Sequence, residues 1–166
     1  AFDPLFALLI TSLLAAAVLA LMPDYRWSAR FNILASFLVL VFALLLFRNR
    51  PPLNDILLAD DLNVVFIALN AFVGFTTSVF SASYIGHELE TGRLTSGYLR
   101  FYHVMYQLMM FGMDLALTAN NIGLMWVAIE LATLSTIMMV GIYRTSAALE
   151  AAWKYFILGS VGIALA

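Results

Sequence analysis

The amino-acid sequence predicts an all-α integral membrane protein with six transmembrane helices. Of its 166 residues, 64% are hydrophobic and only 11% are charged, whereas soluble globular domains have about 45–50% apolar and about 25% charged residues. Apolar runs long enough to cross a bilayer recur along the chain, and short polar segments rich in Pro, Gly, Asp or Arg separate them. Composition and spacing together therefore indicate a multi-pass helical bundle.

The charge and the cysteine content exclude several classes of function. The net charge of −2 gives no indication of a nucleic-acid partner. The absence of cysteine removes disulfides, thiolate-ligated iron–sulfur clusters and Cys-based zinc sites. Two histidines, His87 and His103, are too few for a haem or metal cluster unless carboxylates contribute. We expect neither a cofactor nor a metal in this chain, and no catalytic centre of its own.

Three apolar runs in the first part of the chain predict transmembrane helices over residues 5–22, about 31–47, and 63–84. Pro4 falls in the first turn of the first helix, where its missing N–H does no harm. The second run is almost featureless and fits a lipid-facing packing helix. The third contains small residues such as Gly74 and Ser78, which allow close helix contact, and Asn70, which we expect to form an interhelical hydrogen bond.

Three more helices are predicted over residues 98–118, within 119–143, and from about 149 onward. Only Asn120 and Asn121 separate the fourth helix from the fifth, so these two should form a tight antiparallel hairpin. The polar segment before residue 98 divides the chain into residues 1–97 and residues 98–166. Because the first residue is not Met and the last apolar run continues to residue 166, we expect a piece of a longer protein.

The distribution of basic residues predicts the orientation in the membrane. If the six helices alternate, the first, third and fifth connections lie on one side of the bilayer. These connections and the adjoining helix ends carry Arg26, Arg30, Arg93, Arg100, Arg144 and Lys154, whereas the opposite side has only Arg48 and Arg50. The positive-inside rule then places the first, third and fifth connections in the cytoplasm and the N-terminus outside.

Glu130 is the one carboxylate in the fifth apolar run. It follows Asn121 by nine residues, which at about 1.5 Å per residue puts it about 14 Å below the membrane surface. The hydrocarbon core is about 30 Å thick, so Glu130 lies near the midplane. A carboxylate there costs at least about 2.5 kcal/mol to insert and normally faces protein or water. Burial favours the neutral carboxyl, so we expect Glu130 to take up and release protons; the alternative is a structural carboxyl.

Four further residues are candidates for a proton path that includes Glu130, and three of them also have an alternative explanation. Asp114 lies about 7–8 Å below the outer surface, where it either continues a path from Glu130 or is an acid solvated near the interface. Lys154, the only lysine, either faces the bundle and pairs with Glu130 or reaches outward to the headgroups. Thr133 supplies a hydroxyl on the same helical face as Glu130. His103 can titrate near neutral pH but also fits an interface residue beside Arg100.

The second half of the chain resembles a known family. The run from residue 117 to the end contains A-N-N, then a glutamate in W-V-A-I-E-L, then E-A-A-W-K-Y-F-I-L-G-S. These elements resemble the antiporter-like subunits of respiratory complex I, Mrp-type antiporters and membrane-bound hydrogenases. The stretch V-G-F-T-T-S-V-F-S-A-S-Y-I-G-H-E resembles the third helix of that superfamily. Within it, the resemblance is greatest to the antiporter-like membrane proteins of hydrogenase-4 and formate-hydrogenlyase-type complexes.

The resemblance implies a larger molecule and a role for two residues. Members of this family have about fourteen transmembrane helices with two inverted five-helix repeats, so the chain would be the N-terminal part and residues 98–166 the start of the first repeat. The family's proton-path glutamate falls on Glu130, and the lysine of its E-A-A-x-K-Y-F pattern falls on Lys154. Where this chain has Asp114, the family usually has an apolar or amide residue.

The resulting hypothesis is a membrane protein that couples redox chemistry in partner subunits to proton movement across the membrane. The implied partners are other membrane and peripheral subunits of a redox complex, the lipid bilayer and protons, with Na⁺ as a second candidate ion. The implied location is the bacterial cytoplasmic membrane, and any redox centres would lie in the partners. Two alternatives remain open: a stand-alone Na⁺/H⁺ antiporter subunit, and a structural membrane anchor in which Glu130 only holds helices together.

Overall fold

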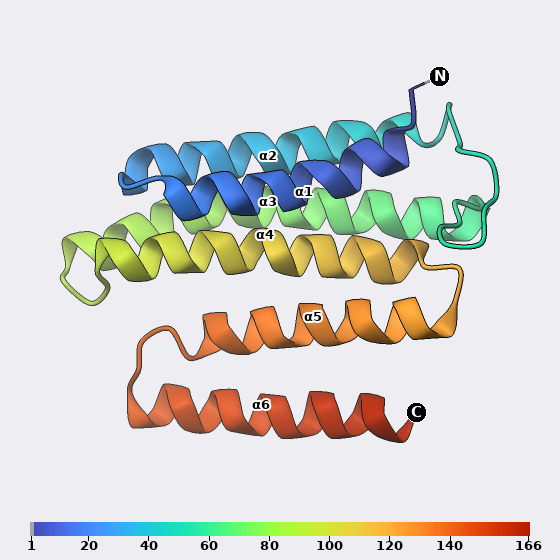
Figure 1. Cartoon of the computed structure of the whole chain (residues 1–166). Helices are drawn as coiled ribbons and strands as arrows, with labels where there is room; N and C mark the ends of the chain where they lie inside the picture. Colours follow the sequence, from blue (N-terminus) through green and yellow to red (C-terminus); the bar gives the residue numbers. More distant parts are fainter. Residues whose placement is uncertain (1) are drawn as a thin grey trace.

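The computed structural model describes residues 2–166 and contains six α-helices, which confirms the all-α prediction (Figure 1). Their bounds are α1 (Pro4–Leu21), α2 (Tyr25–Leu45), α3 (Asp61–Glu90), α4 (Ser96–Thr118), α5 (Ile122–Val140) and α6 (Ser146–Leu165). The helices lie roughly along one common direction, and the connections alternate between the two ends of the bundle. Five of the six, all except α4, are long and apolar enough to cross a membrane.

Helix α4 differs from the others because polar side chains interrupt its apolar sequence. Arg100, His103, Gln107 and Asp114 lower its mean hydropathy. The last three are completely buried among neighbouring helices. Lipid therefore does not contact these polar groups, and protein contacts offset the free-energy cost of inserting them.

Helices α2 and α6 begin three or more residues earlier than the apolar pattern predicts, because side chains cap their first turns. The connection predicted before residue 31 is helical from Tyr25, since the carboxylate of Asp24 accepts a hydrogen bond from the backbone N–H of Arg26 at 2.9 Å. Helix α6 begins at Ser146, where the Thr145 hydroxyl accepts from a backbone N–H in the first turn. Capping of this kind satisfies N–H groups that have no partner within the helix.

Helix α3 is longer than predicted and continues to Glu90. The polar composition of residues 85–90 predicts a loop, but Ile85 packs in a small apolar cluster with Leu94 and Leu99. Glu88 is buried at this end of α3, and Arg93 pairs with its carboxylate at 3.5 Å. Packing at this end of the bundle thus overrides the polar composition of the segment.

Helices α1 to α4 form a bundle, and α5 and α6 follow beside it as a row (Figure 1). Helix α5 packs along α4, and α6 packs along α5. The predicted α4–α5 hairpin is confirmed, and Gly112 makes its close contact possible. A Cβ atom at Gly112 would lie 2.9 Å from the backbone nitrogen of Ala132 and 3.0 Å from the carbonyl oxygen of Ala128. The hairpin therefore fixes α5, and with it Glu130, against the bundle.

The connection between α2 and α3 folds over the α4–α5 turn. The backbone N–H of Leu58 donates to the Thr118 carbonyl at 2.7 Å, and the N–H of Asn120 donates to the Ile56 carbonyl at 2.9 Å. Asn63, in the first turn of α3, adds a bond from its side-chain amide to the Leu117 carbonyl at 3.2 Å. This connection is thus fastened to the end of α4.

Candidate functional site

Glu130 lies near the middle of α5 and faces α6. The Ser160 hydroxyl of α6 donates a hydrogen bond to Glu130 Oε1 at 2.9 Å. The second carboxylate oxygen, Oε2, is buried and has no hydrogen-bond partner among the described residues. The residue as a whole is half-buried. One oxygen is therefore held in place, and the other is free to carry a proton.

The close approach of α5 and α6 at this point depends on a glycine. Gly159 precedes Ser160, and a Cβ atom there would lie 2.8 Å from Cγ2 of Thr133. Thr133 lies about one turn from Glu130, and its hydroxyl donates to the Ile129 carbonyl at 2.9 Å. The Thr133 oxygen can still accept a hydrogen bond, but its proton is already used by the backbone.

Ser160 is a site residue that the sequence pattern does not single out, although it ends the E-A-A-W-K-Y-F-I-L-G-S run. The one available signal is a small Gly-Ser pair in the middle of an apolar helix. Such residues are enriched where transmembrane helices approach closely and form hydrogen bonds.

Lys154 does not pair with Glu130 in this structure. Its ammonium forms an ion pair with Glu150 Oε1 at 2.6 Å, one turn earlier on α6, and its side chain is 70% exposed. The physical reason is the helical position: Lys154 and Ser160 are six residues apart, so they project about 120° apart around α6. Of the two orientations that the sequence allows for Lys154, the structure has the outward one, in a surface pair with Glu150.

Asp114 lies on α4 and is completely buried within the bundle. The side-chain amide of Asn70 on α3 donates to Asp114 Oδ1 at 2.9 Å, which confirms the interhelical bond expected for Asn70. Asp114 Oδ2 is buried without a hydrogen-bond partner among residues 2–166. Within those residues no hydrogen bond joins Asp114 to Glu130, so the two acids occupy separate environments on either side of the α4–α5 contact.

His103 is also completely buried. Its position near the start of α4 is compatible with an interface residue, but the structure places it inside the bundle. Neither ring nitrogen has a hydrogen-bond partner in the described part of the chain. One turn further along α4, the Gln107 amide donates to Asn32 Oδ1 at 2.7 Å and to the Ser36 hydroxyl at 3.3 Å, both on α2. The sequence pattern does not reveal this cluster, because Asn32 and Ser36 are isolated polar residues in a featureless run.

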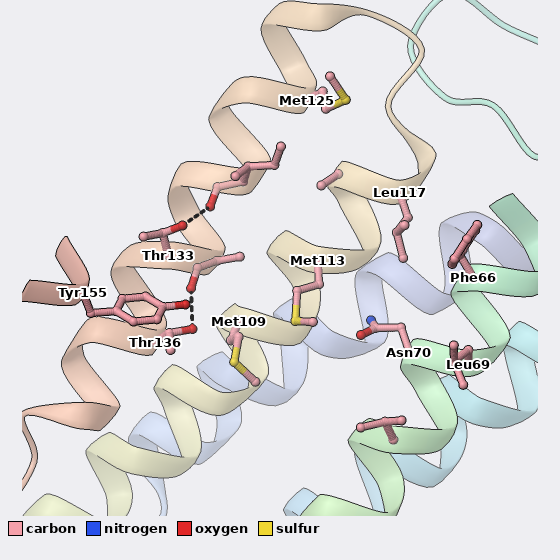
Figure 2. Close-up of a pocket in the computed structure, with 14 residues that line it drawn as sticks. Phe66, Leu69, Asn70, Met109, Met113, Leu117, Met125, Thr133, Thr136 and Tyr155 are labelled. Atoms are coloured by element: carbon pink, nitrogen blue, oxygen red, sulfur yellow. Dashed lines mark hydrogen bonds between the residues drawn. The ribbon is translucent and has the colours of Figure 1, made fainter. Parts of the chain in front are cut away.

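A groove of about 850 Å³ lies between α3 and α5, and side chains of α4 line it between these two helices. Figure 2 shows Asn70 on the α3 side, Thr133 and Thr136 on the α5 side, and methionines of α4 between them. Tyr155 of α6 completes the lining. Most of the remaining lining is apolar, so the groove does not provide a chain of hydrogen bonds between the two acids.

No group of three or more His, Cys, Asp or Glu side chains in residues 2–166 is arranged to hold a metal ion. The chemistry that the site offers is therefore the chemistry of single carboxyl groups inside a helical bundle: hydrogen bonding and proton uptake or release.

Comparison with known proteins gives three matches, although no protein-family model matches the chain. The chain is 55% identical over 160 residues to a hydrogenase-4 component F homologue of Methylacidiphilum infernorum, covering 96% of this chain and 34% of that protein. It is 24% identical over 159 residues to NADH-quinone oxidoreductase subunit N 2 of Thermodesulfovibrio yellowstonii, covering 95% of this chain and again 34% of the relative. A segment of 56 residues is 45% identical to F420H2 dehydrogenase subunit N of Methanosarcina mazei, covering 33% of this chain and 11% of that protein.

The chain thus spans about a third of the length of the two relatives that it matches almost from end to end. The six-helix structure and these matches confirm the resemblance drawn from the sequence. The chain is thus a homologue of hydrogenase-4 component F and of the complex I-type subunit N, and it corresponds to about a third of the length of each.

Proposed function

We propose that the chain is part of a proton-translocating membrane protein, and that Glu130 is its proton-carrying group. The observation that carries this proposal is the geometry of the carboxyl in mid-helix: Oε1 accepts from Ser160 and Oε2 is buried and free. A carboxyl with both oxygens tied to fixed donors would be locked in its ionised form. With one free oxygen, the group can gain a proton on Oε2 without losing its position.

Proton movement through this site is driven by nearby charge. A positive group that approaches Glu130 favours the ionised carboxylate, and its withdrawal favours proton uptake. Lys154 remains the proposed source of such charge within this chain, although its ammonium pairs with Glu150. It would influence Glu130 only after leaving that exposed pair, and pairs of this kind are worth about 0.3–0.5 kcal/mol.

The proposed setting is a bacterial cytoplasmic membrane with the N-terminus outside. Helix α4 would be the sixth span, since its 23 residues correspond to about 34 Å and it packs between α1, α3 and α5.

Other membrane and peripheral subunits of a redox complex would supply the driving reaction. The names of the relatives support this assignment, since each names a hydrogenase, an oxidoreductase or a dehydrogenase.

The deciding experiment replaces Glu130 in the complete complex. Glu130→Gln keeps the size and the hydrogen bond from Ser160 but cannot gain or lose a proton. We expect redox turnover to continue or slow while the rate of proton pumping into sealed vesicles falls markedly. Glu90→Gln is the matched control, because Glu90 is an exposed glutamate at the end of α3.

Two results would reject the proposal in favour of one of its alternatives. Normal pumping by Glu130→Gln, with a failure of Glu130→Ala to assemble, would identify Glu130 as a structural carboxyl. Sodium export coupled to proton uptake in the absence of any redox substrate would identify a stand-alone antiporter.

A further inference from the structure

The buried face of α4 presents a second set of polar side chains, away from Glu130, and two of them can carry a proton. His103, Gln107, Asp114 and Thr118 are all completely buried. Their spacings of four, seven and four residues keep them on one face of the helix. Fifteen residues separate the first from the last, which corresponds to about 22 Å along the helix axis. This face therefore extends through most of the thickness of a hydrocarbon core, which is about 30 Å.

One end of this face is a polar cluster with unused hydrogen-bonding groups. Gln107 Nε2 donates to Asn32 Oδ1, but Gln107 Oε1, Asn32 Nδ2 and both ring nitrogens of His103 are buried without partners among the described residues. Polar atoms that are buried without hydrogen-bond partners are costly in an apolar interior. Buried water that bridges polar groups is the usual way in which such atoms are satisfied.

Other titratable groups lie around His103. Tyr102 is in edge contact with its ring at a centroid distance of 5.4 Å, and Tyr106 follows one turn later. Arg100 precedes it by one turn, and the buried acid Glu88 lies at the same end of the bundle on α3. This end therefore contains one carboxyl group, Glu88, and one imidazole, His103, that can carry protons, together with the fixed positive charge of Arg100.

The other end of the face is the Asp114–Asn70 pair. Asn70 donates to Asp114 Oδ1, so Oδ2 is the oxygen that can carry a proton. Between Gln107 and Asp114 the face is apolar for about 10 Å. Met110 fills this gap against Gly74, where a Cβ atom would lie 2.4 Å from the methionine Cε. The two polar ends are thus separated by one flexible side chain.

We propose that the buried face of α4 is a second proton-transfer column, in which His103 and Asp114 are the proton-carrying groups and water is the ligand of the His103–Gln107–Asn32 cluster. A neutral imidazole accepts a proton on one nitrogen and releases the proton of the other, so His103 returns to its neutral state. Asp114 gains the proton on Oδ2 and releases it from the same atom. Movement of Met110 opens the route between them. The column does not require Glu130 to carry protons.

An exchange of the acid and the amide tests the Asp114 end. Asp114→Asn keeps the shape and the hydrogen-bonding capacity but cannot carry a proton. The double variant Asn70→Asp with Asp114→Asn returns a carboxyl to the other side of the same hydrogen bond. In the complete complex in vesicles, we expect proton transfer to fall about tenfold or more in Asp114→Asn and to recover in the double variant.

Infrared spectroscopy gives a readout that does not depend on pumping. In a Glu130→Gln background, the carbonyl stretching band of a protonated buried carboxyl should shift in D₂O, disappear in Asp114→Asn and return in the double variant. His103→Gln, which keeps hydrogen bonding but cannot titrate, should slow that shift.

The proposal would be overturned if Asp114→Asn pumps at the unaltered rate, or if the carboxyl band does not exchange with D₂O. These outcomes are separate from the fate of Glu130. Normal pumping by Glu130→Gln would remove Glu130 from the mechanism and leave the infrared result on Asp114 unchanged.

Discussion

At the scale of single residues, Asp114 and Glu130 have different surroundings. Asp114 is completely enclosed and receives one hydrogen bond from a fixed amide. Glu130 is half-buried and receives one hydrogen bond from a hydroxyl that can rotate. A rotating hydroxyl can either donate to a carboxylate or accept from a carboxylic acid. Glu130 is therefore the better placed of the two to keep a hydrogen bond in both protonation states.

Ser160 offers a residue-scale test of this point. We predict that Ser160→Ala slows proton pumping by less than Glu130→Gln does, because the carboxyl remains but loses its orienting partner. Ser160→Thr keeps the hydroxyl and should retain most of the rate. Pumping rates of the three variants in vesicles, normalised to redox turnover, provide the measurement. Equal rates for Ser160→Ala and the unaltered protein would show that the bond to Glu130 has no part in transport.

Lys154 gives a second residue-scale prediction, which concerns stability. Its pair with Glu150 joins two exposed side chains at i and i+4, so its loss should lower the free energy of unfolding by no more than about 0.5 kcal/mol. Detergent-solubilised protein with Lys154→Gln should therefore show a melting temperature close to that of the unaltered protein. A large loss of stability would indicate that the lysine has a buried partner.

At the scale of elements, the α4–α5 hairpin is the contact that holds Glu130 against the bundle. Its short connection made the hairpin predictable, since only Asn120 and Asn121 separate the two apolar runs. The way in which the helices touch was not predictable. It depends on Gly112, which lies directly against backbone atoms of α5, and Gly112 is not distinguished from other glycines by its sequence neighbours.

Two glycine variants test this contact. Gly112→Ala places a methyl group against the backbone at Ala132, which cannot move without shifting α5, so we predict a loss of about 1–3 kcal/mol. Gly162→Ala is the matched control, because a Cβ atom there meets nothing within 4 Å and alanine favours the helix by about 0.5–1 kcal/mol. Thermal unfolding in detergent measures both. Equal stability of the two variants would contradict the close packing of α4 on α5.

At the scale of the whole molecule, the arrangement is a four-helix bundle followed by a row of two helices (Figure 1). The apolar side chains of α6 are largely exposed, for instance Trp153 and Leu158. Lipid or further protein can cover such a surface without cost, because both are apolar. Two relatives match this chain over almost its whole length and are about three times as long. Each of these relatives therefore contains further residues beyond the part that corresponds to this chain.

The orientation in the membrane is a whole-molecule prediction that the absence of cysteine makes easy to test. Asp55→Cys places a thiol in the exposed connection between α2 and α3, and Glu90→Cys places one at the opposite end of the bundle. We predict that a membrane-impermeant maleimide added to intact cells labels the first and labels the second only after the membrane is opened. The reverse pattern would invert the topology.

The sequence by itself determined the helical membrane class, the number and order of the helices, the α4–α5 hairpin and the mid-helix position of Glu130. It could do so because hydropathy, helix length and breaker residues act locally along the chain. Only the tertiary structure decided that Ser160 is the partner of Glu130, that Lys154 faces outward, and that His103 and Asp114 share a buried face of α4. Those facts depend on the rotation of each helix about its axis, and close packing between helices that are distant in sequence fixes that rotation.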